Sequence, residues 1–595
     1  MTDSKALKPV LDLEKASSIY NLLDSENEGE RINAFNKLRA LLRKAGITFA
    51  EFRQVGQNEN KEDLRKLYAL MKAQQADALV KLGQQRAEFF CNDAVHATVM
   101  VHGHRANYPV TSTAFKKWLR HEYFRELGLA ADAGAIKTAV EQLAANAEFG
   151  DGTPQHRMQL RTAAVDGRIY IDLCNEVFQC VEVDENGWRV VEAPPSVRFN
   201  RTPSMRALPV PECGGILDLL RPFTNLTDND FVLFVAVLLD AFRHGKHPIL
   251  NLVGEQATAK STLAKMFKKL TDPDETELRS LPATKRDMFI AVYNARVRAW
   301  DNVSKIERAI SDALCQLSDG SGFGTRTLYT DTDETRIQGS RSIILTGLTN
   351  CVTRPDLNSR TVMLTLHPIK EEARRSEVEF WPRFDQAHPL IFGALLDALV
   401  HGLKTLPNIK LDKLDRLPDF QLFGNACDMT GTFTAAFAAN KMELNEAIIE
   451  DDPVATAIMG FMVKRTVWSG TTTELMFQLQ IHDHTEAQVS KQRDWPVDAT
   501  RFGRRLREVT APLRKAGIEV TFGNAPDHNK TRMITLRNIF GRSDAADAAD
   551  AKTKSRPSNR PKKGKRVPSK KAGKKKQRPQ RPSVRKLSSP TRRKR

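Results

Sequence analysis

The chain has 595 residues, of which 91 are lysine or arginine, 72 are acidic and 41% are hydrophobic. This length exceeds what one hydrophobic core organises, so we expect three or four folded units. The longest apolar run, from Phe231 to Leu239, is about half of what a bilayer crossing needs, and no signal segment opens the sequence. The seven cysteines contain no C-x-x-C pair, which is typical of reduced thiols. These features exclude a membrane protein and predict a cytoplasmic one.

The positive charge is concentrated at one end of the chain. Residues 551–595 hold 21 lysines and arginines and no acidic residue, whereas the rest of the chain holds 70 basic and 72 acidic residues. A segment so rich in like charge, proline and serine buries little apolar surface, so we expect a disordered basic tail over residues 541–595. Such a tail neutralises phosphates through counterion release, which predicts contact with nucleic acid. A solubilising tail or a nuclear import signal is the alternative.

The first elements in chain order are helical. Apolar residues recur at helical spacing over residues 13–48, on both sides of an acidic turn, and again over residues 61–88. Residues 1–88 resemble a small helical module of unknown role in phage and mobile-element proteins. Residues 89–205 alternate in short strands around one helical stretch, which predicts a mixed α+β domain. A buried helix then leads from residue 225 into the next domain.

Residues 248–267, PILNLVGEQATAKSTLAKMF, combine a short apolar strand, a glycine turn and an amphipathic helix that begins at lysine. This is the P-loop arrangement, in which backbone N–H groups cradle phosphates, the lysine reaches the β and γ oxygens and a hydroxyl holds magnesium. We therefore predict ATP and Mg²⁺ as cofactors. Ala259 replaces the second motif glycine, which is tolerated if its φ angle stays negative. The predicted binding residues are Gly254, Glu255, Gln256, Ala257, Thr258, Ala259, Lys260, Ser261 and Thr262.

A P-loop enzyme also needs a second strand that ends in an acidic residue. Residues 297–300 form that predicted strand, and Asp301 follows at its end. Asp301 and Ser261 are the predicted magnesium ligands. Asn302 stands next, where many ATPases of this class carry the glutamate that activates water, so the identity of the base stays open. Glu255 and Glu307 are the alternative candidates for this base. The competing interpretation is that both are solvated surface carboxylates.

Downstream, the chain carries a helix, a glycine-rich hairpin-like segment (SGFGTRTLYTDTDETRIQGS), a third apolar strand (RSIILTGLTN) and an arginine-bearing segment (TRPDLNSRTVMLTLHPI). Over about residues 210–370 this order resembles superfamily 3 helicases, especially primase-helicase ATPases of the AAA+ type from phages and plasmids. The whole chain also resembles mostly uncharacterised bacterial mobile-element ATP-binding proteins. The resemblance implies an α/β P-loop NTPase core, AAA+-like, over residues 206–371.

The resemblance also implies roles for residues beyond the loop. Arg326, with Arg336, matches the basic hairpin residues that face DNA in the channel of a hexameric ring. Thr346 occupies the position of the polar sensor, which is usually asparagine, and Asn350 follows four residues later.

Two arginines match the arginine finger that enters a neighbouring subunit's site. They are Arg354 and Arg360, and a salt bridge within its own domain is the alternative for Arg360. The predicted catalytic set is Lys260, Asp301, Asn302 and Arg360.

The sequence of the C-terminal third predicts two further regions. Residues 372–452 are helical by pattern, and residues 453–540 resemble a winged-helix domain in which Asp498 caps a basic helix and two strands form the wing. The helix carries four arginines that suit a DNA groove or backbone, although winged helices also contact proteins: Arg501, Arg504, Arg505 and Arg507.

Three functions follow from these predictions. The leading hypothesis is an ATP-dependent DNA helicase or translocase of a phage or mobile-element replication system, assembled as a homo-oligomer, specifically a hexameric ring. The alternative is a nucleotide-switched DNA-binding regulator or partition-type protein with little turnover, which Asn302 and Thr346 favour. A primase-helicase fusion would need a carboxylate cluster from Asp172, Glu182 and Asp184, for which solvated turn carboxylates are the competing interpretation.

Overall fold

The structure is a computed structural model of the full chain. It describes a few short pieces between residues 18 and 42 and then residues 61–92, 94–320, 323–326, 334–337, 340–481, 488–492, 494–525 and 531–539. The predicted helical hairpin at residues 13–48 and the predicted tail at residues 541–595 lie outside the described residues, apart from those short pieces. The chain divides into two units, Met1–Asn538 and Ile539–Arg595, and every element below belongs to the first.

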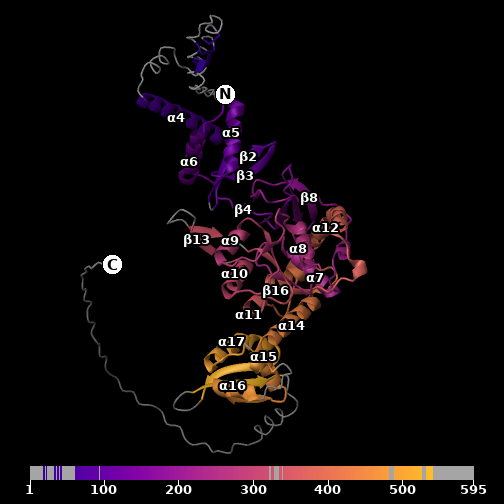
Figure 1. Ribbon diagram of the computed structural model, residues 1–595. Coiled ribbons are helices and arrows are strands. Elements are labelled where there is room, and N and C mark those ends of the chain that lie inside the picture. Colours follow the sequence, from indigo (N-terminus) through magenta and orange to yellow (C-terminus); the bar gives the residue numbers. More distant parts are fainter. Residues whose placement is uncertain are drawn as a thin grey trace, which may run out of the picture. The chain divides into compact units, whose positions relative to one another are not determined.

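The first described elements form a small helix-and-sheet body around one core (Figure 1). Ser112 caps α5 and Asp132 caps α6 by accepting hydrogen bonds from backbone N–H groups. Leu79 and Leu82 of the first helix pack in the same core as Leu119 and Leu143. The predicted boundary at residue 88 therefore does not coincide with a core boundary. The elements are α4 (Lys61–Arg86), β1 (Ala87–Cys91), β2 (Val95–Val101), β3 (His104–Pro109), α5 (Thr113–Leu127) and α6 (Ala133–Phe149).

A four-stranded antiparallel sheet follows, in the order β5-β6-β7-β8. Its inward residues, such as Ile171 and Val181, belong to the main hydrophobic core of the chain. The predicted α+β domain at residues 89–205 is therefore shared between two cores. Its strands are β5 (Thr162–Val165), β6 (Arg168–Asp172), β7 (Gln179–Asp184) and β8 (Gly187–Glu192), beside the short parallel pair β4 (Met158–Gln159) and β9 (Arg198–Phe199).

The centre of the chain is a five-stranded sheet in the order β11-β12-β15-β10-β16, and all its described pairings are parallel. Parallel strands have their carboxyl ends at one edge, so loops that follow different strands meet there. The predicted strand at residues 297–300 is confirmed, since Asp301 is its last residue. The strands are β10 (Ile249–Val253), β11 (Arg279–Ser280), β12 (Val297–Asp301), β15 (Ser342–Gly347) and β16 (Thr361–Thr365).

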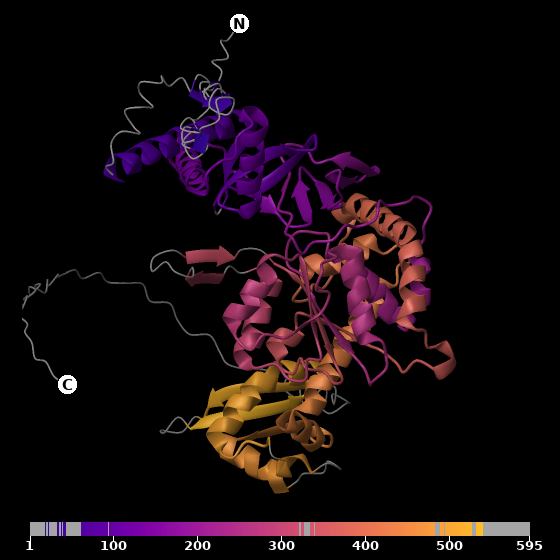
Figure 2. The ribbon, with the colours of Figure 1, turned by 45° about the horizontal axis from the view of Figure 1, so that its top comes forward.

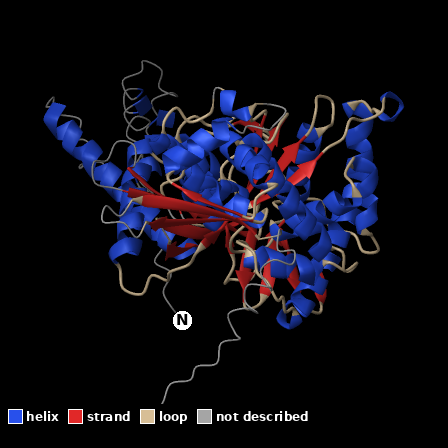
Figure 3. Cartoon of the chain, turned by 90° about the horizontal axis from the view of Figure 1, so that it is seen from below, coloured by secondary structure: helices blue, strands red, loops and turns tan. Residues whose placement is uncertain are grey.

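Side chains alternate between the two faces of this sheet, as the period of a strand requires. Leu250 and Ile344 face the main core, whereas Ile249 and Ile343 face a second cluster with α9, α10 and α11. Figure 3 shows helices flanking the strands on both sides. The helices of the main core include α7 (Asp228–Asp240), α8 (Lys260–Thr271), α12 (Glu377–Thr405), α13 (Pro418–Cys427) and α14 (Phe433–Asp451). Those of the second cluster are α9 (Lys285–Tyr293), α10 (Arg308–Asp319) and α11 (Pro355–Asn358).

The predicted hairpin-like segment contains a pair of short antiparallel strands. They are β13 (Phe323–Arg326) and β14 (Glu334–Ile337), with Arg326 opposite Glu334 and Gly324 opposite Arg336. Figure 2 shows this pair as a separate two-stranded ribbon. The side chains of both arginines lie outside the described residues.

The last described elements form a domain with its own core. Asp498 caps α17 by accepting from the Arg501 N–H at 2.8 Å, and β18 pairs antiparallel with β19, so both predictions are confirmed. Arg505 pairs with Asp452 and Glu508, so its charge is already compensated within the domain. The elements are α15 (Pro453–Met462), β17 (Val467–Gly470), α16 (Thr472–Ile481), α17 (Ala499–Lys515), β18 (Ile518–Asn524) and β19 (Arg532–Asn538).

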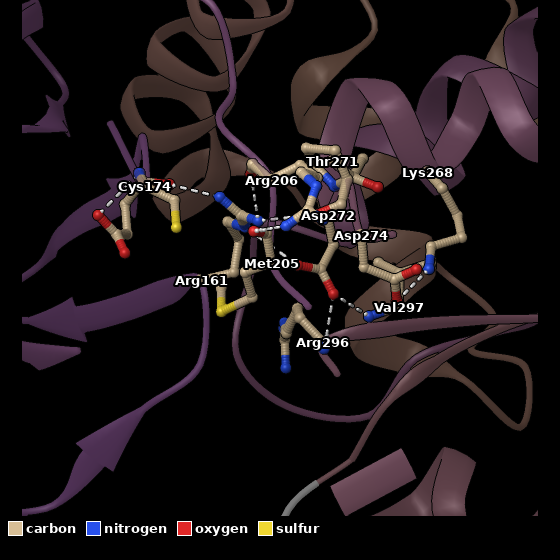
Figure 4. A network of polar contacts seen from close by, with 12 residues as sticks. Arg161, Cys174, Met205, Arg206, Lys268, Thr271, Asp272, Asp274, Arg296 and Val297 are labelled. Carbon is tan, nitrogen blue, oxygen red and sulfur yellow. Dashed lines mark hydrogen bonds and ion pairs between the residues drawn. The ribbon is translucent and has the colours of Figure 1, made fainter. Parts of the chain in front are cut away.

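A buried ion network joins the four-stranded sheet to the helix that follows the glycine turn (Figure 4). Arg161 is fully buried; its Nε donates to Asp272 Oδ1 at 3.0 Å, and its other nitrogens donate to backbone carbonyls. The second Asp272 oxygen accepts the N–H groups of Arg296 and Val297. Because Asp272 ends α8 and Val297 begins β12, the network fixes both elements that carry the candidate site.

One helix of the described chain, Glu377–Asn408, is long and apolar enough to cross a membrane by length and composition. Its apolar side chains, including Phe384, Ile391 and Leu395, belong to the main hydrophobic core. This is the environment of a core helix in a folded domain.

Candidate phosphate-binding site

The predicted glycine turn connects β10 to α8 at the carboxyl edge of the central sheet. A Cβ atom at Gly254 would lie 2.4 Å from the Leu366 carbonyl oxygen, so only glycine fits there. Thr258 is buried, and its Oγ1 donates to the Glu255 carbonyl at 3.0 Å. Glu255 and Gln256 are exposed at the turn, and Thr262 lies half-buried in the first turn of the helix. The turn therefore leaves its backbone N–H groups at the N-terminus of α8, the arrangement that binds anions.

The backbone of Ala259 differs from the sequence-based expectation. We expected a negative φ there, whereas Ala259 has φ +60° and Ala257 also has φ +60°. The left-handed region costs an alanine about 1–2 kcal/mol relative to the right-handed one, so the surrounding structure must offset this strain. Alternating left-handed residues turn successive N–H groups toward one side, as in anion-binding nests. The substitution of glycine by alanine has therefore kept the glycine-type backbone.

Lys260 is the first residue of α8, and its ammonium group folds back over the turn. Nζ donates to the carbonyl oxygens of Gly254 and Glu255 at 2.8 and 2.5 Å, and to Thr258 Oγ1 at 3.1 Å. Burial lowers the pKa of Lys260, while the negative charge of Asp301 acts in the opposite direction. In this structure Lys260 therefore also holds the glycine turn together through its own hydrogen bonds.

The hydroxyl of Ser261 and the carboxylate of Asp301 meet at the edge of the sheet. Ser261 Oγ donates to the two Asp301 oxygens at 3.0 and 3.1 Å. The two residues come from α8 and from β12, and β15 lies between β12 and β10 in the sheet. Hydroxyl and carboxylate oxygens are the ligands that Mg²⁺ prefers, so these residues fit the ion.

Thr346, near the end of β15, completes this cluster. Its buried Oγ1 donates to Asp301 Oδ1 and accepts the N–H of Asn302 at 3.2 Å. Asn302 itself has φ +56°, and its exposed side chain follows directly after the carboxylate. β15 thus holds the end of β12, which carries Asp301, in position through the Thr346 hydroxyl.

Asn350 lies one step away from this cluster. Its Oδ1 accepts from Asn251 Nδ2 at 3.0 Å and from the Val352 N–H at 3.0 Å, so it ties the loop after β15 to β10. Of the two predicted sensor residues, only Thr346 contacts the predicted magnesium ligand. Within the described residues, neither Glu255 nor Glu307 makes a hydrogen bond or ion pair to the Ser261–Asp301 pair.

Arg360 is in a different environment from the one predicted. It is 4% exposed, and its guanidinium pairs with Asp319 at 2.7 Å and with Asp356 at 2.5 Å. Burial disfavours the charged form, but hydrogen bonds to Asp319 and Asp356 outweigh it and raise the pKa of Arg360. A guanidinium held by two carboxylates of its own domain favours the alternative interpretation of Arg360, a salt bridge within its own domain. Arg354 pairs with Asp312 at 2.5 Å and is one-third exposed.

The carboxylates considered for a polymerising site do not form a free cluster. Asp172 is buried and pairs with Arg201 at 2.5 Å. Glu182 pairs with Arg168 and Arg189, and Asp184 also pairs with Arg189. Arg168 and Arg189 of the same sheet and Arg201, which follows β9, compensate their negative charge, as expected for structural carboxylates.

One positioning residue was missed by the sequence reasoning. Asn225 Nδ2 donates to the Thr258 carbonyl at 3.1 Å and to the His367 carbonyl at 2.7 Å, which ties the glycine turn to the segment after β16. An asparagine before a capped helix carries no signal for this contact, because its partners lie 33 and 142 residues away.

Two family models match the chain over adjoining regions. Residues 217–451 match the model described as "Actinomycete integrative conjugative element replication protein", and residues 454–558 match the "AICE RepA C-terminal domain". Together these two parts of one protein family cover more than half of the chain. The chain belongs to this RepA family of mobile-element replication proteins. The mobile-element part of the sequence-based prediction is confirmed, and the RepA match includes the whole glycine turn, Asp301 and Thr346.

Comparison with solved structures found three apo structures of the NrS-1 C-terminal region, two of them described as the A form. They share 12, 13 and 14% sequence identity with the chain, cover 78, 77 and 78% of it and 98% of their own length, and give TM-scores of 0.35, 0.34 and 0.34. We draw no conclusion for the RepA chain from TM-scores this low. No curated protein matched the chain.

Proposed function

We propose that this RepA chain hydrolyses ATP with Mg²⁺ and couples hydrolysis to movement along DNA during replication of the element. The observation that carries the proposal is the meeting of Ser261, Asp301 and Thr346 at the sheet edge that also holds the glycine turn. Three separate segments supply these groups, and their convergence beside a helix N-terminus supports an α/β P-loop NTPase core of the AAA+ type.

Each residue then has a physical role. The N–H groups of the turn hold phosphate oxygens, and Lys260 exchanges its carbonyl partners for phosphate. Ser261 and Asp301 hold the metal ion, and Thr346 keeps the Asp301 carboxylate oriented toward it. Bound Mg²⁺–ATP would supply the phosphoryl group and the positive charge that neutralises it during transfer to water. Asn302 directly follows Asp301 in the sequence, and it is our candidate for orienting the water that attacks the phosphoryl group. Its side-chain amide cannot act as a strong base.

DNA is the proposed macromolecular partner. A replication protein works on DNA, the tail at residues 551–595 offers 21 positive charges, and α17 exposes Arg501, Arg504 and Arg507. The hairpin β13–β14 remains the proposed channel element, through Arg326 and Arg336. A homo-oligomeric ring, hexameric by resemblance, remains part of the proposal. Its finger would then be Arg354, because Arg360 is buried in its own domain.

The decisive experiment is the rate of ATP hydrolysis with and without single-stranded DNA. A motor is stimulated by DNA, and Lys260→Ala abolishes hydrolysis at every DNA concentration. Lys265→Ala is the matched control, since Lys265 lies on the same helix and makes only long ion pairs of 3.9 and 3.7 Å. Wild-type turnover in folded Lys260→Ala protein would reject the P-loop assignment.

A second candidate function is a nucleotide-switched DNA-binding protein with little turnover. The presence of Asn302 after Asp301, in place of a carboxylate, favours it. The same experiment separates the two, because a switch binds ATP and changes its affinity for DNA without DNA-stimulated hydrolysis.

A further inference from the structure

A second pocket opens at the opposite edge of the central sheet from the glycine turn. Lys246, Arg296 and Arg341 line it, and they come shortly before β10, β12 and β15. Because these strands are parallel, their amino ends share this edge, whereas Gly254 and Asp301 lie at the carboxyl ends. A five-residue strand is about 16 Å long, so the pocket is a separate site from the candidate phosphate-binding loop.

The pocket has a volume of about 660 Å³ and is open to solvent. This is the size of sites that hold small organic ligands or one or two nucleotides. Part of its wall comes from Cys91 and from the segment 155–160, which precede the four-stranded sheet. Gly320 and Ser340 also line it, and the segment between these two residues contains the hairpin β13–β14.

We call this site the cationic pocket, because four positive side chains line it against one carboxylate. The four are Arg157 and Lys246, which are exposed, Arg341, which is half-buried, and Arg296, which is 6% exposed. The carboxylate is Asp319, and Arg360 already holds it at 2.7 Å.

Two histidines of the cationic pocket add no charge to it. Burial lowers the pKa of His156, and burial together with the charge of Arg296 lowers the pKa of His244 to about 3. Both imidazoles are therefore neutral at physiological pH, and the pocket keeps its net positive charge.

The guanidinium groups of this pocket are held by carbonyl oxygens. Arg341 donates to Val292 O at 3.2 Å and to Ser340 O at 3.0 Å, and Arg296 donates to Ala241 O at 3.2 Å. Within the described chain, neither forms an ion pair with a carboxylate. Burial lowers the pKa of Arg341 to about 10 and that of Arg296 to about 9, so both stay charged at neutral pH. Buried cations with no directly paired carboxylate are costly, and an anion in the pocket offsets that cost.

We propose that the cationic pocket binds backbone phosphates of single-stranded DNA beside the base of the hairpin. This inference rests on the DNA-binding part of the proposed function and adds a site to it. The guanidinium fork matches a phosphate, and Tyr293, which lines the pocket and is 42% exposed, is a residue type on which unpaired bases stack. A DNA strand fits this open site better than a free nucleotide. Gly320, which precedes β13, and Ser340, which follows β14, both line the pocket.

Cys91 gives a readout inside the cationic pocket. It lines the pocket and is partly exposed, whereas Cys213 is exposed and lies outside the lining. We expect an unlabelled oligo-dT to slow alkylation of Cys91 at least fivefold and to leave Cys213 unchanged, as measured by mass spectrometry after short pulses of N-ethylmaleimide. The same protection is expected in full-length Lys260→Ala protein, because the pocket does not use the P-loop lysine.

A double variant tests the charges directly. Arg157→Gln with Lys246→Gln changes exposed side chains only, so the fold is kept. We expect loss of Cys91 protection and a fall of about 1.4 in the slope of log K against log salt for oligo-dT, since each single-strand phosphate contact contributes about 0.7. The control is Arg383→Gln with Lys404→Gln, the same change of charge at exposed positions of α12.

The outcomes separate the sources of phosphate. Protection of Cys91 by ATP and not by oligo-dT identifies a free-nucleotide site and overturns the strand proposal. An unchanged salt slope for oligo-dT in the double variant, together with unchanged protection of Cys91, also overturns it. DNA-stimulated hydrolysis in that same protein would show that the proposed function stands although the pocket assignment fails.

Discussion

Ser261 Oγ and the carboxylate of Asp301 are joined by hydrogen bonds of 3.0 and 3.1 Å, although 40 residues separate them in the chain. A serine hydroxyl at the start of one helix and an acid at the end of a strand form one oxygen cluster. Their proximity carries the proposed metal site.

Asp301→Asn is expected to lower Mg²⁺-dependent ATP hydrolysis roughly 100-fold, because a metal ion supplies several kcal/mol of charge stabilisation in the transition state. The half-saturating Mg²⁺ concentration should rise at the same time. Hydrolysis is measured across a Mg²⁺ titration, with Asp385→Asn as control, since Asp385 is an exposed carboxylate on α12. An unchanged Mg²⁺ dependence would point to a different ligand.

Thr346→Val keeps the shape of the side chain and removes the hydroxyl between Asp301 and Asn302. A hydrogen bond to a charged group contributes about 1.5–3 kcal/mol, so we expect kcat to fall at least tenfold while ATP affinity changes little. Thr346→Ser restores the hydroxyl and should recover most of the rate. Equal kcat in the Val and Ser variants would remove Thr346 from the site.

Arg360→Ala is expected to destabilise the fold by about 1.5–3 kcal/mol, because Asp319, which is 20% exposed, loses its hydrogen-bonded guanidinium. Thermal unfolding measures this, and Arg354→Ala, at a one-third exposed position, should leave the melting temperature nearly unchanged. Mixing Arg360→Ala with Lys260→Ala should restore no ATPase activity. Recovery of activity in verified mixed oligomers would reinstate Arg360 as a finger.

The same mixing experiment with Arg354→Ala tests the ring. If Arg354 enters a neighbour's site, mixing Arg354→Ala with Lys260→Ala restores activity. One type of subunit interface then combines an intact Lys260 from one subunit with an intact Arg354 from the other. Co-purification of differently tagged subunits verifies that mixed oligomers form.

Asp272→Asn is expected to lower the melting temperature between pH 5 and 8 by a constant amount. Burial alone would raise the pKa of Asp272, but Arg161, Lys268 and the Val297 N–H hold it below its usual value. A depressed carboxylate pKa stabilises the folded state above the unfolded pKa of about 3.9, and this contribution disappears as pH falls through the folded value. The gap between wild type and variant should therefore shrink only below about pH 4. Asp218→Asn, at an exposed position, is the control.

Deletion of residues 551–595 is expected to weaken DNA binding at low salt and to flatten the dependence of log K on log salt, because 21 positive charges are removed. Any sequence preference should survive the deletion, since phosphate contacts carry no base information. Fluorescence anisotropy over a salt series measures both. An unchanged slope would mean that the tail does not contact DNA.

Local patterns were sufficient for the elements that carry chemistry. The segment 297–300 predicted β12 with Asp301 at its end, and a cap before a basic helix predicted α17 after Asp498, because both signals depend on residues close together in the chain. The motif around Gly254 and Lys260 could be recognised for the same reason: strand, turn and helix are consecutive.

The tertiary structure decided which of the remaining polar residues meet. Arg360 lies where a finger is expected by order, yet Asp319, 41 residues away, holds its guanidinium inside the domain. Thr346 contacts Asp301 only because β15 lies beside β12, and Ala259 keeps a positive φ only because the folded loop supports it. The cationic pocket likewise exists only where the amino ends of three parallel strands share one edge. Spacing along the chain fixes neighbours within a helix or strand, whereas long-range partners depend on how the sheet orders its strands.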